Sequence, residues 1–204
     1  MTKHLSEAQY KLVVECEDPH CHGLRHKGVS GDIANRLLLD FLQRRFPRLS
    51  FGTGVVSKAR SSKKRYKHSS KKLSPQADVI AYVGSPYFRR YQYVVVPRSR
   101  VLFVAEVKKW IAPQAVSARN RRLNGQLTRL RKFVSKPVIL VSFRHHGDAS
   151  VLKRNAQASR TFLFSDASPR GYPCDIPNFR RRHLHAGELE GLCKWVKQRA
   201  RKEP

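Results

Sequence analysis

Two acidic residues lie in apolar runs that are typical of strands buried on both faces. Asp78 stands at the start of the run 77–83, and Glu106 stands at the end of the run 101–107, with Lys108 two residues later. A charge inside a buried strand costs several kcal/mol unless it is paired or coordinates a metal. The two carboxylates and the lysine therefore predict a metal-dependent active site.

The chemistry of this site follows from the residue types. Glu106 and Lys108 point to the same side of the expected sheet, because side chains alternate between its faces. The carboxylates of Asp78 and Glu106 suit Mg²⁺ or Mn²⁺, ions that keep several waters and bind phosphate oxygens. Such an ion polarises a scissile phosphate and acidifies an attacking water. Lys108 would orient that water or stabilise the negative charge of the transition state.

The same residues also have structural interpretations. A Glu-x-Lys pattern on a strand is frequently an ordinary ion pair. We favour catalysis for Glu106 and Lys108, because Asp78 occupies a comparable place in the preceding apolar strand. Asp32 falls in the first turn of an expected helix, where the helix dipole stabilises an acid. For Asp32, that interpretation and a metal-ligand role both stay open.

The charge of the chain is strongly positive. Lys and Arg number 42 against 14 Asp and Glu, which gives a formal charge of +28 over 204 residues. So large an excess repels itself in a compact fold, and a polyanionic partner, nucleic acid first of all, explains it best. An anionic membrane is the alternative, but no basic amphipathic helix with an aromatic face supports it.

Basic residues gather in three places. In the segment 58–72, eight of fifteen residues are Lys or Arg, so it cannot bury an apolar face and is expected to form a loop along a phosphate backbone. Others lead into the catalytic strand or begin the helix after it. Taken singly, most are better explained as solvated charges. The candidate nucleic-acid contacts are Lys58, Arg60, Lys63, Lys64, Arg65, Lys67, Lys71, Lys72, Arg89, Arg90, Arg119, Arg121 and Arg122.

The elements that must position these residues follow from apolar periodicity. The segment 17–31, which holds Pro19 and three glycines, is expected to be a loop, with Ser30 as the N-cap of the next helix. Helices are expected over 5–16, 115–134 and 187–201, and a further helix is expected to start within 30–32 and to run to about 45. Strands are expected over 50–58, 77–83, 91–96, 101–107, 138–143 and 161–164.

This order predicts an α/β fold with a mixed central sheet flanked by helices. We expect a single domain over 1–204, with a core of about 28–145, the basic loop 58–72 and a C-terminal strand-and-helix extension over 146–204. The N-terminus has no apolar signal segment, and no run reaches membrane-spanning length. We therefore expect a cytoplasmic protein that is neither secreted nor bound to a membrane.

The four cysteines are too few and too scattered for a disulfide framework. Cys16 and Cys21, beside His20 and His22, resemble half of a zinc site, but no matching pair at finger-like spacing follows. Free thiols in a reducing compartment are the interpretation that we favour.

The element order and the spacing of the acids resemble the PD-(D/E)XK nuclease superfamily. Its core has the order αβββαβ, with an acid in the second strand and an acid-x-lysine closing the third. More narrowly, the chain resembles a bacterial domain family of unassigned role within that superfamily. Four segments carry this resemblance, which covers roughly 20–145: HKGVSGDIANRLLLDFLQRRFP, FGTGVV, SPQADVIAYV and VLFVAEVKKW.

The resemblance implies a restriction-endonuclease-like core and a divalent-metal phosphodiesterase. Asp78 and Glu106 would be its metal ligands and Lys108 its catalytic lysine. Asp32 falls where members commonly carry an acid of the first helix, usually Glu. Gln126 matches a glutamine that some members place near the site, although we favour a plain helix-surface position for it. The proline for which the superfamily is named does not precede Asp78 in this chain. Its absence changes none of the residues that would carry the reaction.

We therefore expect a Mg²⁺- or Mn²⁺-dependent nuclease that hydrolyses DNA as an endonuclease. The alternative is a non-catalytic DNA- or RNA-binding protein on the same fold. RNA processing or packaging would also suit the basic loop. Buried acids argue against mere binding, since a binding module has no need of them. A homodimer would suit cleavage of both strands, but nothing in the sequence supports one.

Overall fold

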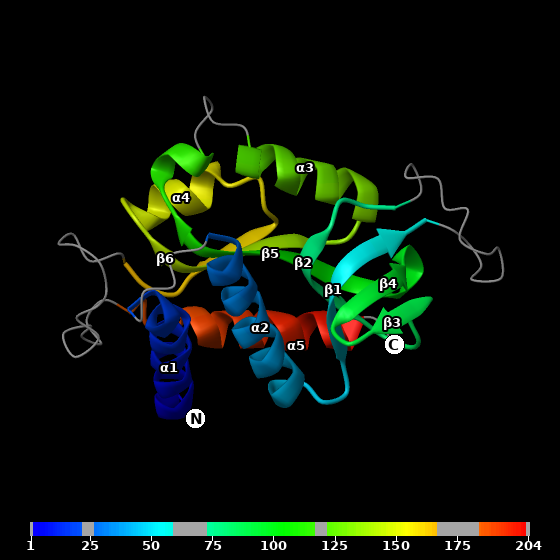
Figure 1. Cartoon of the computed structure of the whole chain (residues 1–204), viewed down its shortest axis with the longest axis horizontal. Helices are drawn as coiled ribbons and strands as arrows, with labels where there is room; N and C mark the ends of the chain where they lie inside the picture. The colour runs from blue at the N-terminus through cyan, green and yellow to red at the C-terminus, as the bar shows by residue number, and fades with distance from the viewer. Residues whose placement is uncertain (1, 22–26, 59–72, 117–121, 167–183, 203–204) are drawn as a thin grey trace.

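A seven-stranded mixed sheet forms the centre of the molecule, and helices cover both of its faces (Figure 1). The computed structural model describes residues 2–21, 27–58, 73–116, 122–166 and 184–202. The strands lie in the order β3-β4-β1-β2-β5-β6-β7. They are β1 Ser50–Ser57, β2 Ala77–Tyr82, β3 Phe88–Arg90, β4 Tyr93–Pro97, β5 Val101–Ile111, β6 Val138–His145 and β7 Arg160–Leu163.

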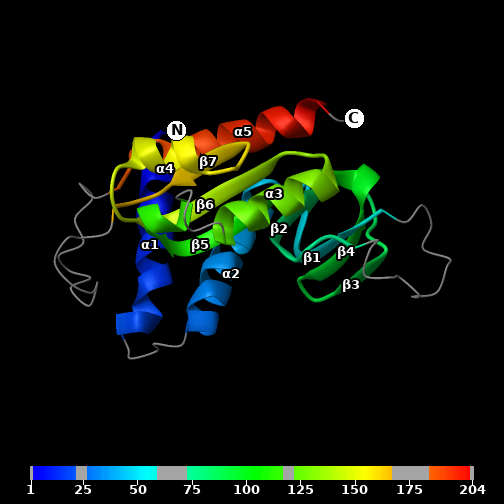
Figure 2. The ribbon, with the colours of Figure 1, turned by 90° about the horizontal axis from the view of Figure 1, so that it is seen from above.

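The predicted α/β class with a mixed sheet is confirmed. β1 and β2 pair antiparallel, as do β2 and β5, whereas β5, β6 and β7 are parallel. Helices α1, α2 and α5 cover one face, and α3 and α4 cover the other (Figures 1 and 2). The helices are α1 Thr2–Cys21, α2 Lys27–Arg45, α3 Arg122–Val134, α4 Ala149–Asn155 and α5 Glu188–Lys202, with short 3-10 turns at Arg98–Arg100 and Pro113–Val116.

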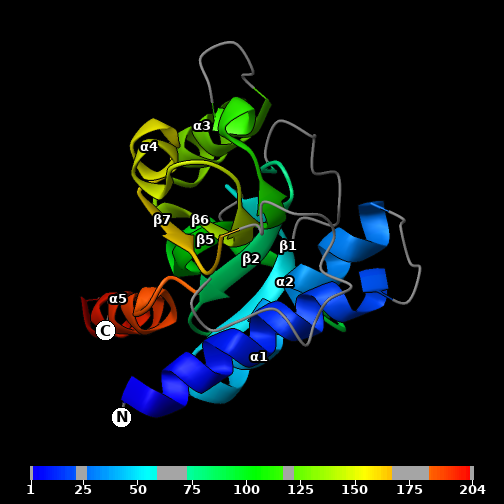
Figure 3. The same cartoon turned by 90° about the vertical axis from the view of Figure 1, so that its left-hand side faces the viewer.

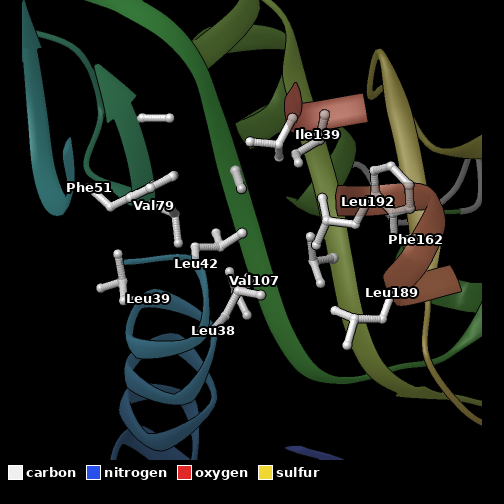
Figure 4. Close-up of a cluster of buried hydrophobic side chains, with 14 of the residues drawn as sticks. Leu38, Leu39, Leu42, Phe51, Val79, Val107, Ile139, Phe162, Leu189 and Leu192 are labelled. Carbon is white, nitrogen blue, oxygen red and sulfur yellow. The ribbon is translucent and has the colours of Figure 1, made fainter. Parts of the chain in front are cut away.

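Each face of the sheet has its own apolar core. On one face, Leu38 and Leu42 of α2 pack with Val79 of β2 and Leu192 of α5 (Figure 4). On the other face, the buried leucines of α3 pack with Val104 of β5. Because full burial of such side chains contributes about 1.5–3 kcal/mol each, the two cores fix the central strands between the helix layers.

The extent of β5 differs from the prediction. The strand runs on to Ile111, so Glu106 and Lys108 lie within it and not at its end. The parallel partner β6 explains the extension, since its pairing with β5 continues as far as Ile111 and His145. The apolar run marked only the buried part of the strand, while backbone hydrogen bonding decides its length.

The predicted loop over 17–31 is also largely wrong. α1 continues to Cys21 and α2 begins at Lys27, which excludes Ser30 as an N-cap. Pro19 falls in the last turn of α1 and Gly28 in the first turn of α2. The first amides of a helix have no intrahelical partner in any case, and Gly28 lies in that turn. Pro19 removes one backbone hydrogen bond, but only from the last turn of α1.

The C-terminal segments share the main sheet and its core. β7 extends the sheet beyond β6, and Trp195 of α5 packs edge-on against Phe103 of β5 with ring centroids 5.0 Å apart. Within the described ranges, every helix is too short or too polar to traverse a lipid bilayer.

Candidate active site

Asp78 and Glu106 face each other across two central strands. The antiparallel register of β2 and β5 pairs Val79 with Ala105, so one further step along each strand sets Asp78 opposite Glu106. Oδ2 of Asp78 accepts a hydrogen bond from the backbone amide of Val107 at 2.8 Å. The sheet therefore brings together the two acids that the sequence singled out, and their catalytic role stays a prediction.

Glu106 is a buried carboxyl group with two side-chain partners. Only 1% of the residue is exposed. Nζ of Lys108 donates to its Oε1, and Nε2 of Gln126 donates to its Oε2 at 2.7 Å. Burial raises the pKa of Glu106 to about 7, and the nearby carboxylate of Asp78 adds to this rise, while Lys108 opposes it. The ionised form of Glu106 is therefore costly in this place, and a neighbouring positive charge stabilises it.

Lys108 lies on the same side of β5 as Glu106, as the alternation of the strand predicts. Its side chain is 34% exposed, so the ammonium group reaches both the buried carboxylate and solvent. A cation in this position can balance the charge of Glu106 or meet an anionic group that enters from outside.

Two amide side chains complete the surroundings of the acids. Nδ2 of Asn35 in α2 donates to Oδ1 of Asp78 at 3.2 Å. Gln126 of α3 contacts Glu106, so the preference for a plain helix-surface role is wrong: the packing of α3 turns this face toward the strands. Sequence reasoning missed Asn35, although its position three residues after Asp32 puts both on one helical face.

Asp32 is exposed on α2, one turn before Asn35. In the described part of the chain, no hydrogen bond or ion pair joins Asp32 to Asp78 or Glu106. Its predicted role as a metal ligand remains untested.

The donor set suits a hard divalent cation. Two carboxylates, one of them buried and of raised pKa, present oxygen ligands side by side, and Mg²⁺ and Mn²⁺ prefer oxygen ligands. The neutral amides of Asn35 and Gln126 orient these carboxylates without adding charge. The residues present therefore fit such an ion.

The predicted nucleic-acid contacts are only partly described. Arg89 and Arg90 are exposed on the edge strand β3, and Arg122 is exposed at the start of α3. Nζ of Lys58 lies 4.3 Å from the ring centroid of Phe133, a cation–π contact with α3. The other candidates lie outside the described residues: Arg60, Lys63, Lys64, Arg65, Lys67, Lys71, Lys72, Arg119 and Arg121.

The Cys and His residues at the end of α1 that resemble half of a zinc site are likewise only partly described. Cys16 is buried, as is Cys193 in α5. The side chains of His20, Cys21 and His22 lie outside the described residues.

The fold of this chain is similar to that of solved NucC structures. NucC of E. coli MS115-1 in its cAAA-bound form superposes with a TM-score of 0.64 at 14% identity, over 98% of this chain and 90% of that one. The chain has the NucC nuclease fold. The apo form of the same NucC gives a TM-score of 0.54 at 14% identity, over 97% of this chain and 92% of NucC.

A second NucC, that of P. aeruginosa ATCC27853 in its cAAA-bound form, gives a TM-score of 0.57 at 14% identity, over 80% of this chain and 75% of NucC. No protein-family model matches the sequence, and the search of curated proteins gives no match either. The likeness to NucC therefore concerns the fold, and the chemistry has to be argued from the site.

Proposed function

We propose that this protein is a divalent-metal-dependent endonuclease that hydrolyses phosphodiester bonds of DNA. The observation that carries the proposal is the pairing of Asp78 with the buried Glu106 across β2 and β5, with Lys108 on the latter carboxylate. A purely structural role would leave an acid of raised pKa in the core with nothing gained. The NucC fold and the resemblance to the PD-(D/E)XK superfamily support the same conclusion.

Asp78 and Glu106 would hold the ion, for which Mg²⁺ is the natural candidate and Mn²⁺ the alternative. When bound, such an ion supplies Lewis-acid polarisation of the scissile phosphate and lowers the pKa of water. Asp32, one turn from Asn35, is proposed as a further ligand that would help to hold the ion.

Lys108 acts on the reacting atoms in this proposal. Its ammonium group contacts Glu106 and is partly exposed, so it can donate a hydrogen bond to the attacking water or to a phosphate oxygen. A fixed positive charge stabilises the negative charge that develops on the phosphate as the new P–O bond forms and the old one breaks. Lys108 therefore lowers the barrier without having to move.

Asn35 and Gln126 are positioning residues. Each donates an amide hydrogen bond to one of the two carboxylates and restricts its rotation. Because α2 and α3 pack on opposite faces of the sheet, the two acids are held from both sides. This support keeps the ligand oxygens aligned when no cation is bound.

The proposed substrate is DNA because of charge. With a formal charge of +28, the chain favours a polyanion, and phosphate contacts position a duplex without reading its sequence. RNA is the alternative substrate, and a homodimer is proposed for cleavage of both strands. The proposed location is the cytoplasm.

Cleavage assays test the proposal. Plasmid, linear duplex, single-stranded DNA and RNA are incubated with Mg²⁺, Mn²⁺ or EDTA. Because two of the NucC structures are cAAA-bound forms, each reaction is run with and without cAAA. We expect metal-dependent cutting of DNA, including closed plasmid, by the wild type. The variants Glu106→Gln and Lys108→Ala should bind DNA but leave it intact.

Lys109→Ala is the matched control. Lys109 neighbours Lys108 in sequence, but strand alternation turns it to the other face of β5. It should cut like the wild type. The proposal is wrong if the wild type cuts no better than Glu106→Gln with every metal tested, both with and without cAAA. The protein would then be a non-catalytic nucleic-acid-binding protein on the same fold.

A further inference from the structure

A second group of metal-ligating side chains lies away from the candidate active site. His145, Asp166 and His185 each direct one ligand atom toward the other two. His145 ends β6, Asp166 follows β7, and His185 precedes α5; Figure 3 views the molecule from the side where β6 and β7 lie. The residues come from three segments, so no short motif joins them.

The three ligand atoms form a small triangle. Nε2 of His145 lies 2.6 Å from Nε2 of His185, and Oδ1 of Asp166 lies 3.2 and 3.1 Å from these two nitrogens. A tetrahedral Zn²⁺ with bonds of about 2.0–2.2 Å holds its ligand atoms about 3.3–3.5 Å apart. The two N···O distances are close to this value, and the N···N distance has to open by about 0.7 Å.

The backbone holds the three ligands in place. The amide of His145 donates to the carbonyl of Ser165 at 3.0 Å, and the amide of His185 donates to the carbonyl of Phe164 at 2.9 Å. Isolated backbone β-bridges pair His145 with Asp166 and Ser165 with Leu184. These main-chain bonds align the donors before any metal binds, which lowers the entropic cost of forming a site.

The exposed fraction of the three side chains increases from His145 through His185 to Asp166. The side chain of His145 is fully buried, that of His185 is 28% exposed, and that of Asp166 is 50% exposed. A cation can therefore enter from the side of Asp166 and His185 and meet His145 at the bottom. Because His185 is partly exposed, its ring can shift by the distance of about 0.7 Å that the N···N pair requires.

We infer that His145, Asp166 and His185 bind a Zn²⁺ ion that fastens the segment before α5 to the ends of β6 and β7. Two imidazoles and one carboxylate are ligands of zinc and of similar transition metals, whereas Mg²⁺ prefers oxygen ligands alone. Three protein ligands leave the fourth position of the tetrahedron to a water molecule.

This site is separate from the candidate active site. In the register of β5 and β6, His145 lies opposite Ile111, five residues along β5 from Glu106. At about 3.3 Å per residue, the two places are about 16 Å apart along the strand. The inference does not depend on the proposed nuclease function, and either can fail alone.

Zinc binding to the full chain tests the inference. Protein freed of metal by chelation and dialysis is titrated with Zn²⁺ by calorimetry, and with Co²⁺ to detect the visible absorption of a tetrahedral site. We expect the wild type to bind one more Zn²⁺ than His185→Ala or Asp166→Ala, or to bind that ion at least about 100-fold more tightly. His146→Ala is the matched control, because this neighbouring exposed histidine lies outside the triangle and should bind zinc like the wild type.

Two further measurements separate a metal site from a structural role. His185→Cys supplies another zinc ligand and should restore binding. Zn²⁺ should raise the melting temperature of the wild type and of His185→Cys, but not that of His185→Ala. Glu106→Gln should keep the zinc. Equal zinc stoichiometry and affinity in the wild type, His185→Ala and Asp166→Ala would overturn the inference, as would a wild type that binds no zinc.

Discussion

The two candidate metal sites of this molecule differ in chemistry and in place. Asp78 and Glu106 present only oxygen and lie between two central strands, whereas His145 and His185 add nitrogen near the outer strand β7. Burial raises the pKa of Glu106 to about 7, and burial together with the neighbouring His185 lowers the pKa of His145. Burial thus favours the uncharged form in both clusters.

The consequence for metal binding is opposite in the two clusters. A neutral Glu106 must release its proton before it can bind a cation, whereas a neutral imidazole is already in its ligand form. Cation binding at Glu106 should therefore release a proton and weaken as the pH falls below about 7. The buried His145, whose pKa is lowered, should bind a cation without releasing a proton at neutral pH.

The largest expected effect tests which cluster carries the reaction. Glu106→Gln keeps the size of the side chain but removes its charge, so we expect DNA cleavage to fall by at least about 10³-fold. His185→Ala should cut at nearly the wild-type rate under conditions where it is folded. The reverse pattern in a plasmid nicking assay would mean that the histidine cluster is the catalytic centre.

The pH dependence of stability tests the burial of Glu106. Its pKa in the folded protein is about 7 against an ordinary 4.5, so the unfolded chain loses this proton first. Stability contributed by protonated Glu106 is therefore present below pH 4.5 and is lost as the pH rises to 7, by up to about 3 kcal/mol. The free energy of unfolding of Glu106→Gln should not show this decrease, because glutamine does not titrate.

Urea unfolding in EDTA, at several pH values, measures that difference. The stability of Glu106→Gln relative to the wild type should increase by up to about 3 kcal/mol from pH 4.5 to 7.5. Parallel curves for the two proteins would show that Glu106 titrates normally and that the contrast between the clusters is smaller than described.

A smaller effect is expected at the positioning residue Gln126. Gln126→Ala removes one hydrogen bond to Glu106, and we expect the turnover rate to fall about tenfold while DNA affinity stays constant. Thr128→Ala on the same helix is the control. A fall in affinity with unchanged turnover would instead place Gln126 in DNA binding.

The smallest effect compares the two edges of the sheet. Arg89→Ser or Arg90→Ser on β3 should each weaken DNA binding about threefold at low salt and reduce its salt dependence, because each removes one proposed phosphate contact. Arg160→Ser on β7, an exposed arginine at the opposite edge, should leave DNA binding unchanged. Fluorescence anisotropy with a labelled duplex, over a range of salt, measures all three variants. Equal losses would mean that DNA has no preferred edge.

The sequence predicted the oxygen cluster because its signals are local. Apolar alternation marked β2 and β5, and a charge within either run stood out at once. The strand pairing then places Asp78 opposite Glu106 without further information. Asn35 and Gln126 escaped a correct assignment, because the face that each helix turns inward is decided by tertiary packing.

The histidine cluster could not be predicted from spacing. Its members span residues 145 to 185 and meet only through the parallel pairing of β6 and β7 and the segment before α5. The sequence instead drew attention to Cys16 and Cys21, which lie close together and so resemble a zinc motif. Short spacing is easy to see, but a metal site requires only that the folded chain bring its donors together.

Gln9 of α1 has a consequence for how the chain is made. This buried residue donates to the carbonyls of Phe164 and His185 at 2.8 and 2.9 Å and accepts from the amide of Leu189 at 3.1 Å. Its partners are synthesised at least 155 residues after it. On the ribosome, α1 therefore cannot complete its buried hydrogen bonds until the first turn of α5 has emerged. In a nascent chain interrupted before that point, α1 can pack against α2, but the amide of Gln9 stays exposed to water and to chaperones.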